Sequence, residues 1–78
     1  MTPDDIKPGM KVKYTGATLW LRPNPYGIVT ELRQDSTDGW MVTIQTEVAN
    51  PNNGWNKFTA FLWNIGPDDR NVQLDLSF

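Results

Sequence analysis

The sequence predicts a small all-β domain, and three observations lead to this prediction. First, the stretch Gly39–Val48 alternates between two sets of side chains with the period of two that is typical of a half-buried strand. Second, residues that favour turns bound it, with Asp38-Gly39 before it and Asn50–Gly54 after it. Third, the rest of the chain consists of similar short segments, and we find no amphipathic helix. We therefore expect the neighbouring segments to pair with Gly39–Val48 as a meander.

The length of 78 residues limits the chain to a single domain, which we take to span residues 1–78. A chain of this size buries about 60% of the surface that it exposes when unfolded, so its core is thin. An apolar fraction of 38% and a mean hydropathy of −0.51 are typical of a soluble globular protein. We expect five strands, near residues 10–15, 27–33, 40–48, 56–62 and 72–78, after a polar lead-in at residues 1–9.

The side chains within these strands divide into buried and exposed faces. In the first strand Met10, Val12 and Tyr14 are expected to face the core, and in the third strand Trp40, Val42, Ile44, Thr46 and Val48. The second strand has two registers, one that buries Ile28 and Leu32, and one with a bulge at Thr30-Glu31 that buries Val29 and Leu32. In the fourth strand we place Phe58 and Ala60 inward, followed near Leu62 by a short 3₁₀-like turn. Residues 66–69, Gly-Pro-Asp-Asp, are expected to form a turn.

The connection between the first two strands, Gly16–Tyr26, is long and unusually apolar. Pro23 and Pro25 prevent regular sheet pairing and favour an extended backbone. The same segment carries the apolar residues Leu19, Trp20 and Leu21. Such a loop either folds back onto the core or presents an apolar surface to a partner, and the sequence leaves these two alternatives open.

Five short strands with one long connection fit a small closed barrel, in which Ile6 would close one end. The segment Ile6–Val12, where a Pro-Gly turn precedes alternating basic and apolar residues, is similar to the start of the first strand in SH3-like barrels. Tyr26–Val29, with a glycine followed two positions later by valine, is similar to their second strand. The chain thus resembles this architecture, which includes the KOW-type domains and a small peripheral photosystem I subunit. Two features depart from it: the basic character of nucleic-acid-binding KOW domains is missing, and Asn64–Asn71 lengthens the final hairpin.

The charge balance and the residue types limit the function classes. Seven basic and nine acidic residues give a net charge of −2, which does not favour a nucleic acid as partner. Histidine and cysteine are both absent, so the common general base, the thiol nucleophile and the soft metal ligands are missing. The Asp pairs stand beside Pro, Gly or Ser, where Asp commonly caps turns. We therefore expect no enzyme activity, no metal site and no cofactor.

The start of the chain, Thr2-Pro3-Asp4-Asp5, is polar and acidic where a signal peptide would be basic and then apolar. No apolar run approaches the roughly 20 residues of a membrane span. We therefore expect a cytoplasmic protein without a membrane partner.

Four tryptophans in 78 residues make the aromatic residues the most informative group. We place Trp40 in the core, and Trp63 in the core or as a plug of the barrel. Aromatic and proline residues of the long first loop, together with Trp55 just after Gly54, are suited to dock an extended peptide or an apolar anchor. The candidate partner-binding residues are Trp20, Arg22, Pro23, Pro25, Tyr26 and Trp55.

We expect a non-catalytic protein–protein binding module, acting as an accessory subunit, an adaptor or an inhibitor of a larger partner. One alternative is a KOW-like nucleic-acid-binding module, in which the chain's cations contact phosphates and Trp20 or Tyr26 stacks on bases. Those cations are Lys7, Lys11, Lys13, Arg22 and Arg33. Another alternative is a small structural subunit of a larger assembly, including a viral one. The sequence leaves the oligomeric state open.

Overall fold

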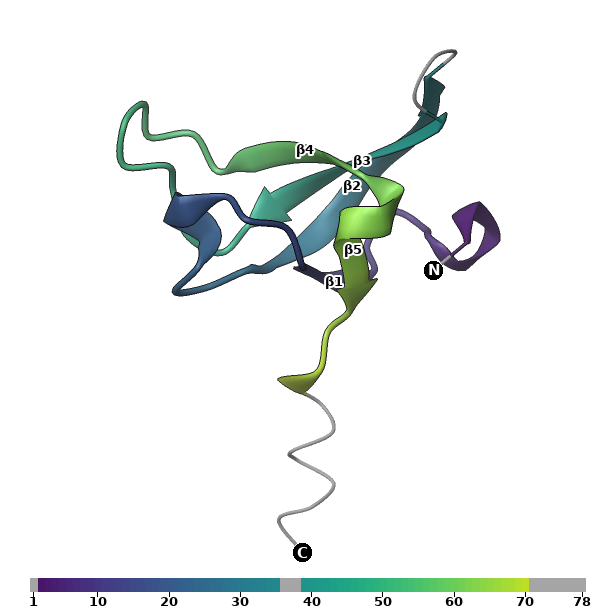
Figure 1. Cartoon of the computed structure of the whole chain (residues 1–78), viewed down its shortest axis with the longest axis horizontal. Helices are drawn as coiled ribbons and strands as arrows, with labels where there is room; N and C mark the ends of the chain where they lie inside the picture. The colour runs from purple at the N-terminus through teal and green to yellow at the C-terminus, as the bar shows by residue number, and fades with distance from the viewer. Residues whose placement is uncertain (1, 36–38, 71–78) are drawn as a thin grey trace, which may run out of the picture.

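The computed structural model describes residues 2–35 and 39–70 and shows an all-β domain built on one five-stranded antiparallel sheet (Figure 1). The strands are β1 (Lys11–Tyr14), β2 (Tyr26–Asp35), β3 (Gly39–Thr46), β4 (Lys57–Phe61) and β5 (Ile65–Pro67). Three short 3₁₀ turns accompany them: η1 (Pro3–Asp5), η2 (Leu19–Leu21) and η3 (Leu62–Asn64).

The strand order in the sheet is β4-β3-β2-β1-β5. The first four strands form the expected meander, and β5 returns to pair with the outer side of β1. The two edge strands, β4 and β5, are consecutive in the chain and are joined only by the three residues of η3. The sheet is therefore strongly curved, and Figure 1 shows β4 and β5 running in different directions on either side of η3.

The core lies on the concave side of the sheet and is built from the alternating positions that the sequence predicts. Val12 and Tyr14 of β1 and Val42, Ile44 and Thr46 of β3 are all buried. Met10, Trp40, Val48 and Phe58 pack partly buried against this core, and Ala60 is buried. These faces of the first, third and fourth strands are confirmed. Ile6 is also buried in the core cluster.

The second strand takes the bulged register. Val29 pairs with Ile44 and Glu31 pairs with Thr43, so Thr30 is the extra residue of a bulge. Val29 is consequently buried, Leu32 packs against the core, and Ile28 is 43% exposed. The Thr30 hydroxyl donates to the Thr43 carbonyl at 3.2 Å and so ties the bulge to β3.

The fifth strand differs from the prediction. Gly66 and Pro67, expected in a turn, lie instead in β5, where Gly66 pairs with Lys13 and Pro67 with Val12. The physical reason is that Ile65 is buried against the core, which draws the residues after it alongside β1. The strand predicted at residues 72–78 lies outside the described residues.

The 3₁₀-like turn after β4 is confirmed as η3, but the placement of Trp63 in the core or as a plug is wrong. Residues three apart in a 3₁₀ helix share a face, so Leu62 and Ile65 both point inward and are buried. Trp63 between them points outward and is 66% exposed.

Candidate functional site

The long connection between β1 and β2 partly folds onto the core and partly faces solvent. Leu21 is fully buried, and Trp20 packs edge to face on Phe58 of β4, with 5.9 Å between the ring centroids. Leu19, the residue before them, is 72% exposed. Each of the two alternatives for this loop therefore holds for different residues. Trp20 and Leu21 pack against the core, and Leu19 is exposed to solvent.

The 3₁₀ geometry of η2 explains this division. Thr18 and Leu21 are three residues apart and share the inner face. The Thr18 hydroxyl is 3.0 Å from the hydroxyl of Tyr14, which ties the start of η2 to the end of β1. Leu19 is thereby turned away from the core. At the other end of η2, Arg22 adopts a helical conformation and donates its N–H to the Leu19 carbonyl at 3.1 Å.

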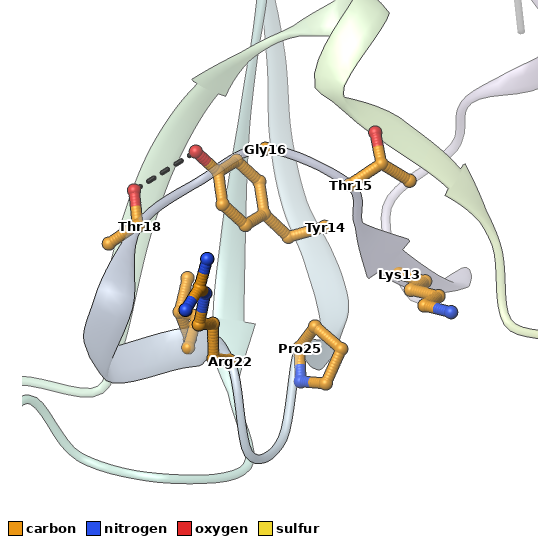
Figure 2. Close-up of a pocket in the computed structure, with 8 residues that line it drawn as sticks. Lys13, Tyr14, Thr15, Gly16, Thr18, Arg22 and Pro25 are labelled. Atoms are coloured by element: carbon orange, nitrogen blue, oxygen red, sulfur yellow. Dashed lines mark hydrogen bonds between the residues drawn. The ribbon is translucent and has the colours of Figure 1, made fainter.

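A concave recess of about 290 Å³ lies between this loop and the end of β1. The buried residues Tyr14 and Leu21 are among those that line it, while Lys13, Thr18 and Arg22 contribute polar groups. Figure 2 shows the Arg22 guanidinium pointing toward the Tyr14 ring and the Lys13 side chain extending away from it. The full lining is Lys13, Tyr14, Thr15, Gly16, Thr18, Leu21, Arg22 and Pro25.

Two cations border this recess, and their electrostatic states differ. The Lys13 ammonium donates to Asp69 at 3.0 Å, and this bond raises the pKa of Lys13. Arg22 is exposed, and its guanidinium forms no ion pair with any residue in the described ranges. A carboxylate of a partner could therefore pair with the Arg22 guanidinium, whereas the Lys13 ammonium already pairs with Asp69.

Tyr26 lies outside the recess, in a polar cluster that ties the segment after β5 to the sheet. Its hydroxyl donates to Asp69 at 2.7 Å, and the Arg70 guanidinium lies 3.7 Å from its ring centroid. The hydrogen bond from Tyr26 and then the one from Lys13 lower the pKa of the Asp69 carboxyl, and the same bond to Asp69 raises the pKa of Tyr26. Both the ring and the hydroxyl of Tyr26 are thus already engaged.

Arg70 completes this cluster by bridging two carboxylates. It contacts Glu47 at 2.6 Å and Asp68 at 2.8 Å, and its hydrogen bonds lower the pKa of both carboxyls. Asn24 also donates to Glu47, at 3.3 Å, and accepts from the Tyr26 N–H at 3.3 Å. The charges of residues 68–70 are therefore largely compensated within the domain.

The structure brings only part of the predicted partner-binding set together. Arg22 and Pro25 line the recess, and Pro23 is exposed between them in the chain. Trp20 is directed to Phe58, and Tyr26 to Asp69. Trp55 is 69% exposed, but it lines a different hollow of about 250 Å³ together with Gly54, Asn56 and Lys57.

Besides Ile28 of β2, the exposed large apolar side chains that were missing from the predicted set are Leu19 and Trp63. Their signal in the sequence is the spacing of their neighbours. The pairs Thr18/Leu21 and Leu62/Ile65 are each three residues apart, which would place the residue after the first member on the outer face of a 3₁₀ turn.

Other site types find no counterpart in the described ranges. Residues 2–35 and 39–70 contain no group of three acidic side chains placed to hold a metal ion. No helix among these residues has the combination of length and apolar character that a membrane crossing requires. Comparison with known proteins gives no match to a protein family, a curated protein or a solved structure. The class that the fold defines is thus a small antiparallel five-stranded β-domain.

Proposed function

We propose that the chain is a non-catalytic protein–protein binding module, serving as an accessory subunit, adaptor or inhibitor of a larger protein. Its binding surface comprises Leu19, Arg22, Pro25 and the recess beside them, here termed the loop surface. One observation carries the proposal: Leu19 is 72% exposed although the next two residues are packed into the core. An exposed leucine held by a buried anchor is an ordered apolar contact, so binding costs little conformational entropy.

The chemistry of the loop surface suits a partner segment that combines an apolar side chain with a carboxylate. The apolar side chain would contact Leu19, and the carboxylate would pair with Arg22, which has no other ion pair among the described residues. Pro25 lines the recess with a rigid backbone, because its ring fixes the φ angle. Interface energy concentrates in a few such anchors, with arginine among the most frequent.

The proposal includes the finer fold, an SH3-like barrel. Two contacts support closure of the curved sheet. Tyr14 of β1 and Phe58 of β4 touch edge to face across the core, although two strands separate them in the sheet. The Thr15 N–H donates to the Asn64 carbonyl at 2.7 Å, which joins the end of β1 to η3. β4 and β5 are the two edge strands of the sheet and are not hydrogen-bonded to each other. In such a barrel these two edges would therefore be joined by side-chain contacts and by η3.

No specific observation favours the nucleic-acid alternative. Lys13 is paired with Asp69, Trp20 packs edge to face against Phe58, and one face of the Tyr26 ring lies against the Arg70 guanidinium. Retention on a nucleic-acid column that falls steeply with added salt would favour that alternative over a protein partner.

The test is a capture experiment with two matched arginine variants. The full chain, its Arg22→Ala variant and its Arg33→Ala variant are immobilised, and the proteins retained from a native lysate are identified. Arg33 is an exposed arginine on β2, away from the recess, and serves as the control. We expect a protein that the unchanged chain and Arg33→Ala retain and that Arg22→Ala loses. A titration with that purified protein should show about tenfold or greater weakening for Arg22→Ala. Equal binding by both variants would contradict the proposal.

A further inference from the structure

The two edges of the sheet differ in how well they resist pairing with another strand. The edge strand β5 has three residues and ends in Pro67, which has no N–H to offer. The other edge strand, β4, has five residues, contains no proline and pairs with β3 without a bulge. Among the described residues, β4 is therefore the edge that remains open to a further strand.

The backbone groups that face this open edge follow from the register. The Thr46 N–H donates to the Asn56 carbonyl at 2.7 Å, in continuation of the β3–β4 ladder. Successive residues of an antiparallel strand direct their backbone groups to opposite sides, so Phe58 and Ala60 also face β3. The groups that point to the open edge are the N–H and C=O of Lys57 and Thr59 and the N–H of Phe61, because the Phe61 C=O, at the N-cap of η3, accepts the first hydrogen bond of that turn.

The same three residues share the outer face of the sheet, opposite the core side where Ala60 is buried. Lys57 carries the sole charge of β4 and has no ion pair with any described residue. At the other end of the strand, Phe61 stacks on Trp63, with 4.3 Å between the centroids and an interplanar angle of 9°. Trp63 is 66% exposed, so one end of this row is cationic and the other end is an open aromatic stack.

We propose that a second copy of this chain pairs with β4, so that two β4 strands run antiparallel about a two-fold axis at Thr59. Thr59 then opposes Thr59 of the second copy, and Lys57 opposes Phe61. In this register the two Thr59 residues exchange both of their edge hydrogen bonds, and the Lys57 carbonyl of each copy accepts from the Phe61 N–H of the other. The five-stranded sheet becomes continuous across the two copies.

Charge complementarity supports the second copy as the occupant. The antiparallel arrangement brings Lys57 of each copy beside the Phe61–Trp63 stack of the other, where an ammonium is attracted to the aromatic faces. No like charges oppose each other, because each β4 contains a single charged residue and its opposite position is aromatic. The strand is thus self-complementary at every edge-facing position.

The symmetry also limits the assembly to two copies. A two-fold contact uses the same strand on both partners and therefore closes. The edges left outside the pair are the two β5 strands, which are short and end in proline. Because the contact is a single strand pair, we expect a weak dimer that forms with a dissociation constant of about 10 µM to 1 mM.

The test is sedimentation equilibrium of the full chain across that concentration range, with two variants at one position. Thr59→Pro removes an N–H that faces the open edge and leaves the ladder to β3 intact. Both substitutions remove the Thr59 hydroxyl and its contact with the Thr43 hydroxyl. Thr59→Val keeps the backbone N–H, so it is the control for the loss of the hydroxyl. We expect Thr59→Val to dimerise like the unchanged chain and Thr59→Pro to bind about tenfold or more weakly.

A second variant and an exchange measurement keep the proposal testable if Thr59→Pro unfolds. Lys57→Glu places a carboxylate against the aromatic stack and should weaken the dimer, whereas Lys57→Arg should preserve it. Amide exchange at Thr59 and Phe61 should slow as protein concentration rises. A monomer throughout the range overturns the proposal, and so does protection of these amides that is independent of concentration, since the edge is then covered within one chain. A dimer that Lys57→Glu leaves intact also overturns it.

Discussion

The rings of Tyr14 and Phe58 meet edge to face, with 5.0 Å between their centroids and an angle of 73° between their planes. They belong to β1 and β4, which are not neighbours in the sheet, so this contact joins strands that no backbone hydrogen bond connects. Trp20 from η2 adds a second edge-to-face contact to the same Phe58 ring. The aromatic cluster therefore couples the curvature of the sheet to the position of the long loop.

This coupling predicts different effects for two substitutions of Tyr14. Tyr14→Ala removes the ring from both the core and the Phe58 contact and should cost about 3–5 kcal/mol of unfolding free energy. Tyr14→Phe keeps the ring and loses the hydrogen bond to Thr18, so it should cost about 1 kcal/mol. Urea unfolding of both variants measures the difference. Equal costs would mean that the hydroxyl, and not the ring, joins β1 to its surroundings.

Gly27 of β2 is expected to tolerate a side chain poorly. It pairs with Val12 on one side and Thr46 on the other, and a Cβ built on it would lie 2.7 Å from the Gln45 carbonyl oxygen. Because that obstacle is backbone, Gly27→Ala must separate β2 from β3 and should cost about 1–3 kcal/mol. The control is Gly66→Ala in β5, where the nearest atom, Thr15 Cγ2, is 3.5 Å away. Thermal unfolding should show a lower midpoint for Gly27→Ala alone.

The polar cluster around Arg70 predicts a loss of stability in acid. The pKa values of Glu47, Asp68 and Asp69 are all lowered in the folded chain. A lowered folded pKa contributes stability above the unfolded value, and this stability is lost as the pH falls through the folded value. The loss should therefore begin below about pH 5, where Glu47 and then the two aspartates start to bind protons in the unfolded chain, and between about pH 5 and 8 these carboxyls should contribute no change in stability.

The variant that tests this acid dependence is Asp69→Asn, which cannot lose a proton and so cannot form the ion pair with Lys13. Its unfolding free energy should change less between neutral and acid pH than that of the unchanged chain. Glu31→Gln, on the exposed side of β2, is the control for removing one negative charge. An identical pH dependence for Asp69→Asn and the unchanged chain would exclude Asp69 as a source of the acid loss.

Alternation of side chains predicted most of the sheet because it reports burial on one face of a strand. It placed Val12 in β1, the buried face of β3, and the inward Ala60 of β4. It could not identify β5, because three residues are too few to show a period and Gly66-Pro67 is typical of a turn. What selects a strand there is a tertiary effect, the burial of Ile65.

The candidate site was harder to predict because it depends on contacts between distant residues. Tyr26 and Asp69 are 43 residues apart, and no local pattern indicates that they are hydrogen-bonded. The three residues of η2 are all apolar, so their residue types do not indicate which of them are buried. The 3₁₀ turn and the Phe58 ring decide among them, which leaves Leu19 outside and Trp20 inside.

That division yields the most direct test of the loop surface. Leu19→Ala should leave the unfolding free energy nearly unchanged, because the side chain is 72% exposed. It should reduce the binding free energy of the partner by about 1–2 kcal/mol. Trp20→Ala removes the ring that packs on Phe58 and should lower the melting temperature. Melting curves and binding titrations on the same two variants separate these effects. If Leu19→Ala binds with unchanged affinity, the partner contacts another surface, whatever Trp20→Ala does to stability.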